Sequence, residues 1–163
     1  MKTLLILRHA KSSWDEPELA DIQRPLNKRG KNDAPRVGEI IKEAGLVPDI
    51  ILSSPAVRAV KTAEATADTC GYEGEIEIRE NFYPGSPGDY IEALNEIPDG
   101  YARVMVVGHN PGLEELLSDL TGESEPLPTA ALAQVELAIQ RWIDLDDKVL
   151  GKVARIWRIK ELS

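Results

Sequence analysis

The chain has 163 residues, of which 42% are hydrophobic and 29% are charged, and its formal net charge at pH 7 is -9. That length allows one well-packed core, so we expect residues 1–163 to form one domain. A surface with this negative balance repels DNA, RNA and anionic membranes, which excludes a broad nucleic-acid or membrane partner. The single cysteine, Cys70, cannot form an internal disulfide, and we expect it to be buried on a helix.

The first residues, MKTLLILRHAK, contain an apolar run that Arg8 interrupts too early for a signal peptide. No later apolar stretch is long enough to span a membrane. We therefore expect a cytoplasmic protein.

Aliphatic runs and helical spacings alternate along the chain. Short aliphatic runs predict strands that are covered on both faces, and apolar residues at helical spacing predict helices that end at a glycine. Such an alternation is typical of an α/β fold, a three-layer α/β/α sandwich with a mostly parallel central sheet. In chain order, we expect a strand at 3–7, a helix at 34–44, a strand at 49–53, a helix at 56–67, a short helix at 90–96, a strand at 103–107 and a helix at 113–120.

The C-terminal region has a different pattern. Residues 131–139 and 152–159 read as β-rich segments, and a polar turn near Asp146-Asp147 joins them. We expect this pair to form an antiparallel hairpin at the edge of the sheet.

Polar and cationic residues follow each of the three predicted strands, where ligands bind in an open parallel sheet. Arg8-His9-Ala10-Lys11-Ser12 follows the first strand, and Gly108-His109-Asn110-Pro111 follows the third. After the second strand, we expect Ser54 to cap a helix and Pro55 to be its first residue, with Arg58 on the opening turn.

Two helix N-termini should therefore meet Arg8, His9, Arg58 and His109, which predicts an anion site. Taken singly, a histidine near a strand end is more often structural, and an arginine there is more often a surface charge. However, the chain has only two histidines, and both occupy equivalent positions. A metal would need closer ligand spacing and would be repelled by the arginines, so we expect neither a metal nor another cofactor.

Three segments together resemble the histidine phosphatase superfamily, the phosphoglycerate-mutase-like proteins. They are LRHAKS at 7–12, SSPAVRAVKTAE at 53–64 and VVGHNPGLEEL at 106–116. The short chain, the alanine after the histidine and RPLNKRG at 24–30 are similar to the SixA-type phosphohistidine phosphatases. The resemblance implies that His9 is the nucleophile and becomes transiently phosphorylated, while Arg8, Arg58 and His109 hold the phosphoryl group.

The chemistry of these side chains agrees with that implication, because a neutral imidazole is a competent nucleophile and guanidinium groups match phosphoryl oxygens. In many members of the superfamily a carboxylate protonates the leaving oxygen, and Glu80 is the positional candidate here. The alternative is that Glu80 is a solvated loop charge. SixA-type members are expected to lack a clear equivalent, which favours phosphohistidine because its P–N bond needs less proton assistance to break.

Further candidate substrate contacts lie close to the predicted site. Arg24 is one candidate, although an exposed arginine before a turn explains it more simply. The polar loop residues after the first strand have a similarly simple alternative. We expect the three tryptophans to pack rather than to stack on bases. The candidate contacts are Lys11, Ser12, Arg24 and Asn110, and the tryptophans are Trp14, Trp142 and Trp157.

We therefore expect a metal-independent phosphohydrolase that acts through a phosphohistidine at His9 on a phosphohistidine-bearing protein. A small-molecule phosphomonoesterase with the same site is the first alternative, and a proton-donating Glu80 would favour it. A mutase is disfavoured because the chain is short. A non-catalytic protein that binds a phosphorylated ligand is the alternative from another class.

Overall fold

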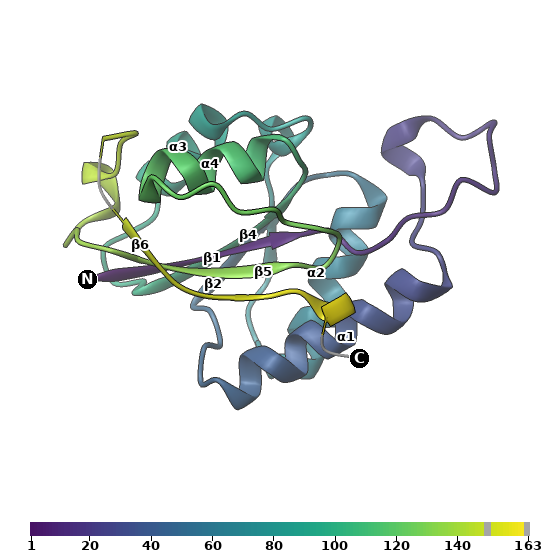
Figure 1. The fold of residues 1–163 in the computed structure, drawn as a ribbon, viewed down its shortest axis with the longest axis horizontal. Helices are drawn as coiled ribbons and strands as arrows, with labels where there is room; N and C mark the ends of the chain where they lie inside the picture. The colour runs from purple at the N-terminus through teal and green to yellow at the C-terminus, as the bar shows by residue number, and fades with distance from the viewer. Residues whose placement is uncertain (149–150, 162–163) are drawn as a thin grey trace.

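A computed structural model describes residues 1–148 and 151–161. Its middle layer is a six-stranded sheet in the order β3-β2-β4-β1-β5-β6 (Figure 1). The first four strands run parallel, whereas β5 is antiparallel to β1 and β6 is antiparallel to β5. This confirms the mostly parallel sheet with an antiparallel C-terminal pair at one edge. The strands are β1 (Lys2–Arg8), β2 (Ile50–Ser53), β3 (Ile76–Ile78), β4 (Arg103–Gly108), β5 (Leu132–Leu137) and β6 (Gly151–Trp157).

Helices cover both faces of the sheet. α1 (Lys28–Glu43) and α2 (Val57–Cys70) lie on one face, and α3 (Pro87–Asn95) and α4 (Gly112–Thr121) lie on the other (Figure 1). The predicted three-layer α/β/α sandwich is therefore confirmed. Among the described helices, none combines the length and the apolar character that crossing a membrane requires.

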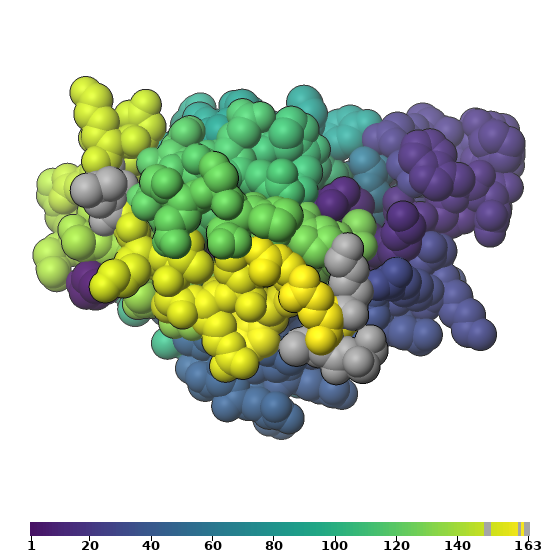
Figure 2. Space-filling view, viewed as in Figure 1, coloured from purple at the N-terminus to yellow at the C-terminus, as the bar shows by residue number. Residues whose placement is uncertain are grey.

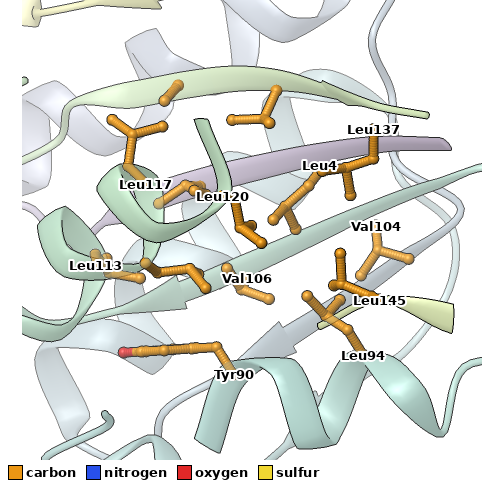
Figure 3. Close-up of a cluster of buried hydrophobic side chains, with 14 of the residues drawn as sticks. Leu4, Tyr90, Leu94, Val104, Val106, Leu113, Leu117, Leu120, Leu137 and Leu145 are labelled. Carbon is orange, nitrogen blue, oxygen red and sulfur yellow. The ribbon is translucent and has the colours of Figure 1, made fainter. Parts of the chain in front are cut away.

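Alternation along β1 divides the core between the two helical layers. Leu4 and Ile6 belong to the cluster under α3 and α4, part of which Figure 3 shows, and Leu5 and Leu7 belong to the cluster under α1 and α2. All four side chains are fully buried, and burial of each stabilises the fold by about 1.5–3 kcal/mol. β1 is thus a rigid support for the residues that follow it.

The ends of the helices agree only in part with the sequence pattern. α2 and α4 stop, as predicted, before glycines in the left-handed conformation, Gly71 (φ 85°) and Gly122 (φ 75°). α1 begins six residues before the predicted 34–44 stripe, because the Asn27 side chain caps it by accepting the Gly30 N–H at 2.9 Å. β3 was not predicted, since its three residues, IEI, form no apolar run.

The predicted packing roles of Cys70, Trp142 and Trp157 are confirmed, since all three side chains are buried and Cys70 is a free thiol. The segment 9–27, between β1 and α1, protrudes beyond the end of the sheet (Figure 1). It contains a short 3₁₀ turn, η1 (Asp21–Gln23). A second turn, η2 (Glu80–Phe82), precedes α3, and a third, η3 (Trp142–Asp144), precedes β6.

Candidate active site

A pocket of about 380 Å³ lies where β1, β2 and β4 end, beside the protruding segment. The four side chains that the strand ends were expected to bring together all line it: Arg8, His9, Arg58 and His109. Its charge opposes that of the whole chain, because four cationic side chains among its described lining residues face one carboxylate. The cations are Arg8, Lys11, Arg24 and Arg58, and the carboxylate is Asp21.

Backbone pairing and one threonine fix the relative positions of these residues. β1 and β4 are in register up to Arg8 and Gly108, and the His9 N–H then donates to the Gly108 carbonyl at 3.2 Å. The Thr62 hydroxyl accepts the Ala10 N–H at 2.9 Å and donates to the Arg58 carbonyl at 2.7 Å. Thr62 therefore ties the first turn of α2 to the segment that carries His9.

The His9 imidazole is held in one tautomer. Its Nδ1 lies 2.7 Å from the Ala10 carbonyl oxygen, which can only accept, so Nδ1 carries the proton and donates it. Burial lowers the pKa of His9 to about 3, and the nearby His109, Arg58 and Arg8 also lower it, despite the opposing effect of the hydrogen bond to Ala10. At neutral pH the ring is therefore uncharged, and Nε2 has a free lone pair.

His109 is the second buried imidazole of the site, and its ring centroid lies 5.1 Å from that of His9. Its Nε2 is 2.7 Å from the Ser54 hydroxyl, and its backbone N–H donates to the Tyr90 hydroxyl at 3.3 Å. Burial first, and then the charge of Arg58, lowers the pKa of His109 to about 4. His109 is thus also neutral at pH 7, and it contributes a hydrogen-bonding group rather than a positive charge.

The predicted cap at Ser54 and the predicted first helical residue at Pro55 are both wrong. α2 begins at Val57 with Ala56 in the N-cap position, because the Ser54 hydroxyl accepts the Ala56 N–H at 3.1 Å and also contacts His109. Pro111 occupies the N-cap position of α4, while the Asn110 side chain accepts the Glu114 N–H at 3.3 Å. Arg58 nevertheless lies on the first turn of α2, as the sequence indicated.

Asp21 is a lining residue that the sequence reasoning missed. Its Oδ2 accepts hydrogen bonds from Arg58 Nη2 at 2.9 Å and from the Tyr83 hydroxyl at 2.7 Å, and its Oδ1 accepts one from Arg24 at 2.9 Å. The bond from Tyr83 and the two arginines hold the pKa of Asp21 well below its usual range. The available signal was the spacing of Asp21 and Arg24, three residues apart before a proline, which suits a pair across one 3₁₀ turn.

Arg24 is buried at the pocket, so its interpretation as an exposed arginine was wrong. Its guanidinium donates to the Ser12 hydroxyl at 2.6 Å and to the Ser13 carbonyl at 3.0 Å, in addition to Asp21. It also lies over the Trp14 ring, with its central carbon 3.3 Å from the ring centroid. The predicted packing role of Trp14 is wrong, because this residue is 72% exposed at the pocket.

The other predicted site residues have different surroundings. Lys11 is exposed and lines the pocket, and Ser12 lines it while accepting from Arg24. Asn110 also lines it, but its amide nitrogen already donates to the Glu114 carboxylate and the Leu127 carbonyl. Glu80, the candidate general acid, is exposed at the start of η2 and does not line the pocket.

Acidification is expected to destabilise the fold through the two buried histidines. Their pKa values in the folded chain, about 3 and about 4, lie below the value of about 6.5 for an unfolded chain, so the unfolded state binds more protons below pH 6.5. The contribution of the two neutral histidines to the free energy of unfolding is complete above that pH. As the pH drops toward 4, it falls by up to about 1.4 kcal/mol per pH unit for each histidine. Urea unfolding at pH 7 and pH 5 measures this loss.

The matched control for that measurement is His109→Gln, which should lose less stability than the wild type between the two pH values. His9→Gln should behave in the same way. An equal loss in the wild type and in both variants would contradict the prediction.

Within residues 1–148 and 151–161, no group of three or more His, Cys, Asp or Glu side chains is arranged to hold a metal ion. The pocket instead gathers guanidinium groups around a neutral imidazole with a free lone pair. Guanidinium groups stabilise the charge of a phosphoryl group, and an imidazole can accept that group. Fold and site together define an α/β protein of the phosphoryl-transfer class.

Comparison with known proteins agrees with this class. The model of the histidine phosphatase superfamily (branch 1) matches residues 4–90. An uncharacterised chloroplastic protein of Arabidopsis thaliana is 36% identical over 150 residues, which cover 86% of this chain and 69% of that protein. The phosphohistidine phosphatase SixA of Escherichia coli K12 is 29% identical over 140 residues, which cover 82% and 84%. The chain therefore belongs to the histidine phosphatase superfamily.

A solved structure of the protein histidine phosphatase SixA complexed with tungstate matches with a TM-score of 0.83 at 25% identity, over 99% of both chains. The resemblance of the sequence to SixA-type proteins is thus confirmed in the fold. Family and neighbours together support phosphohydrolase activity. Because the Arabidopsis relative is chloroplastic, the cytoplasmic location stays a prediction.

Proposed function

We propose that this chain hydrolyses phosphohistidine in proteins, with His9 as the nucleophile. The observation that carries the proposal is the 2.7 Å contact of His9 Nδ1 with the Ala10 carbonyl, inside a pocket of cationic side chains. This contact leaves Nε2 as the nitrogen with a free lone pair. Nε2 attacks the phosphorus and forms a new N–P bond, while the bond from phosphorus to the leaving ring nitrogen breaks. The other nitrogen of that ring takes a proton from solvent, so the ring leaves as a neutral imidazole. Water then attacks the phosphoenzyme, which releases phosphate and restores neutral His9.

In the proposed role, Arg8, Arg58 and His109 hold the phosphoryl oxygens during both steps. Arg8 donates from Nη1 to the Leu127 carbonyl at 3.1 Å, and its buried Nε has no hydrogen-bond partner among the described residues. An unpartnered buried donor is costly unless a ligand satisfies it. This favours a bound oxyanion beside Arg8, and the tungstate in the SixA structure is an oxyanion of the same tetrahedral shape as phosphate.

The pocket favours a leaving group that needs little protonation. Among the described lining residues Asp21 is the one carboxylate, and its lowered pKa keeps it ionised at neutral pH, so it is a poor proton donor. Glu80 lies outside the pocket. A P–N bond to imidazole breaks with less proton assistance than an alkyl phosphate ester, which supports phosphohistidine over ordinary phosphomonoesters.

The test compares phosphate release from a phosphohistidine-bearing carrier protein and from p-nitrophenyl phosphate, both in the presence of EDTA. We expect release from the protein to be resistant to EDTA. Its kcat/KM should be at least about tenfold above that for the ester, which corresponds to about 1.4 kcal/mol of transition-state stabilisation. A preference for the ester would support the small-molecule phosphomonoesterase instead. Tight binding of orthovanadate with no turnover of either compound would support a binding protein.

A further inference from the structure

Trp14 lies at the mouth of the pocket, on the segment 9–27 that stands out from the right-hand end of the molecule in Figures 1 and 2. At 72% it is the most exposed large hydrophobic side chain among the described residues, whereas Trp142 and Trp157 are buried in the core. The fold therefore does not use this indole for packing. Ligand pockets are lined largely by hydrophobic and aromatic side chains, so the position of this indole on the pocket lining points to a role in binding.

Trp14 is nevertheless held in place. One face of its ring lies against the Arg24 guanidinium, 3.3 Å from the ring centroid to the central carbon. Arg24 is only 8% exposed, and hydrogen bonds to Ser12, Ser13 and Asp21 fix its orientation. Because a buried arginine held by three hydrogen bonds supports one face, the rest of the indole forms a preorganised surface at the mouth.

The geometry of phosphoryl transfer places the leaving group on that side of the pocket. His9 is 7% exposed and attacks from within, so the leaving group, which must be in line with the attacking nitrogen, faces the mouth. There the Arg24 cation on one face of the indole disfavours a second cation on the other. A neutral planar group is favoured, and the unprotonated ring of phosphohistidine is such a group. Its far nitrogen takes a proton from solvent at the mouth as the P–N bond breaks, so the ring leaves as a neutral imidazole.

We propose that Trp14 is a specificity-determining residue that stacks on the planar leaving group. The inference rests on the proposed function and adds the substrate feature that the rim selects: a neutral ring attached to the phosphoryl group. One aromatic pair contributes an effect of about 3- to 10-fold. Trp14 therefore changes which substrate is preferred, whereas His9 and the arginines determine whether any phosphoryl group is transferred.

Two small compounds with P–N bonds isolate this effect: phosphoimidazole, which has the ring, and phosphoramidate, which lacks it. We expect Trp14→Ala to lower the ratio of kcat/KM for phosphoimidazole to that for phosphoramidate about 3- to 10-fold. Trp14→Phe should keep most of the ratio, because it retains an aromatic face. Ile143→Ala is the matched control, since Ile143 is 59% exposed on η3 and does not line the pocket.

The outcomes separate this inference from the proposed function. An unchanged ratio in Trp14→Ala, with equal kcat/KM losses for both compounds, would overturn the role of Trp14 and leave the proposed function intact. A ratio that falls equally in Trp14→Phe would overturn stacking as its cause. If the wild type releases phosphate from the carrier protein but from neither compound, the role of Trp14 is overturned and the proposed function stands; if it releases phosphate from none of the three, both fail.

Discussion

Replacing His9 by alanine is expected to lower kcat/KM for phosphohistidine hydrolysis by at least about 10³-fold. The variant loses the His9 imidazole, which is 7% exposed and neutral, and whose Nε2 has a free lone pair in a pocket that Arg8, Arg58 and His109 also line. Water cannot replace it efficiently, because a water molecule in the vacated space has neither the nucleophilicity nor the fixed orientation of the imidazole. Phosphate release under single-turnover conditions measures the loss.

Covalently bound phosphate distinguishes nucleophilic catalysis from a merely electrostatic role of His9, because phosphate on a histidine nitrogen is labile in acid. Rapid quenching at high pH should trap an acid-labile phosphoenzyme in the wild type and none in His9→Ala. The variant should still bind orthovanadate, since Arg8, Arg58 and His109 remain. Turnover within about tenfold of the wild type, a loss far below the expected effect of removing a nucleophile, would show that His9 is not the attacking group.

The fold was largely predictable because its core strands are continuous aliphatic runs. Leu4–Leu7 is buried on both faces, and such a run specifies a central strand without tertiary information. The exceptions are elements whose residues carry no such pattern. β3 is only three residues long, Ile76–Ile78, and none of them is buried. The polar first turns of α1 are specified by the Asn27 cap rather than by an apolar stripe.

The centre of the site was also predictable, because parallel strands end at the same edge of the sheet. Arg8 is the last residue of β1, and His9 and His109 come directly after β1 and β4. Its rim was not. Asp21, Arg24 and Trp14 lie on the irregular segment 9–27, which has no periodic pattern. Their mutual contacts depend on how that segment folds back over the pocket, and residue spacing alone does not encode such a path.

Arg58 bridges the predictable centre and the unpredicted rim, and its geometry decides whether it is free to act. In the structure Nη1 donates to the Asp21 carbonyl at 2.7 Å and Nη2 donates to the Asp21 carboxylate at 2.9 Å. A guanidinium has five N–H donors, so these two bonds leave others for a phosphoryl group. Asp21 therefore orients Arg58 without having to leave when substrate binds.

Replacing Arg58 by alanine is accordingly expected to lower kcat/KM about 10²- to 10³-fold, the usual effect of removing one donor that stabilises transition-state charge. Arg58→Lys should recover only a minor part, because an ammonium group cannot contact both Asp21 and a phosphoryl oxygen with a planar fork. Steady-state kinetics on the phosphohistidine-bearing carrier protein measures both variants.

Arg141→Ala is the matched control, since Arg141 is an exposed arginine that pairs with Asp144 three residues along and does not line the pocket. It should keep wild-type kcat/KM, because an exposed ion pair of this kind contributes little to the stability of the fold. A loss below about tenfold in Arg58→Ala, far under the usual effect of such a donor, would mean that Arg58 serves Asp21 rather than the phosphoryl group. In that case Arg8, whose Nε is buried without a partner among the described residues, would be the principal cationic donor.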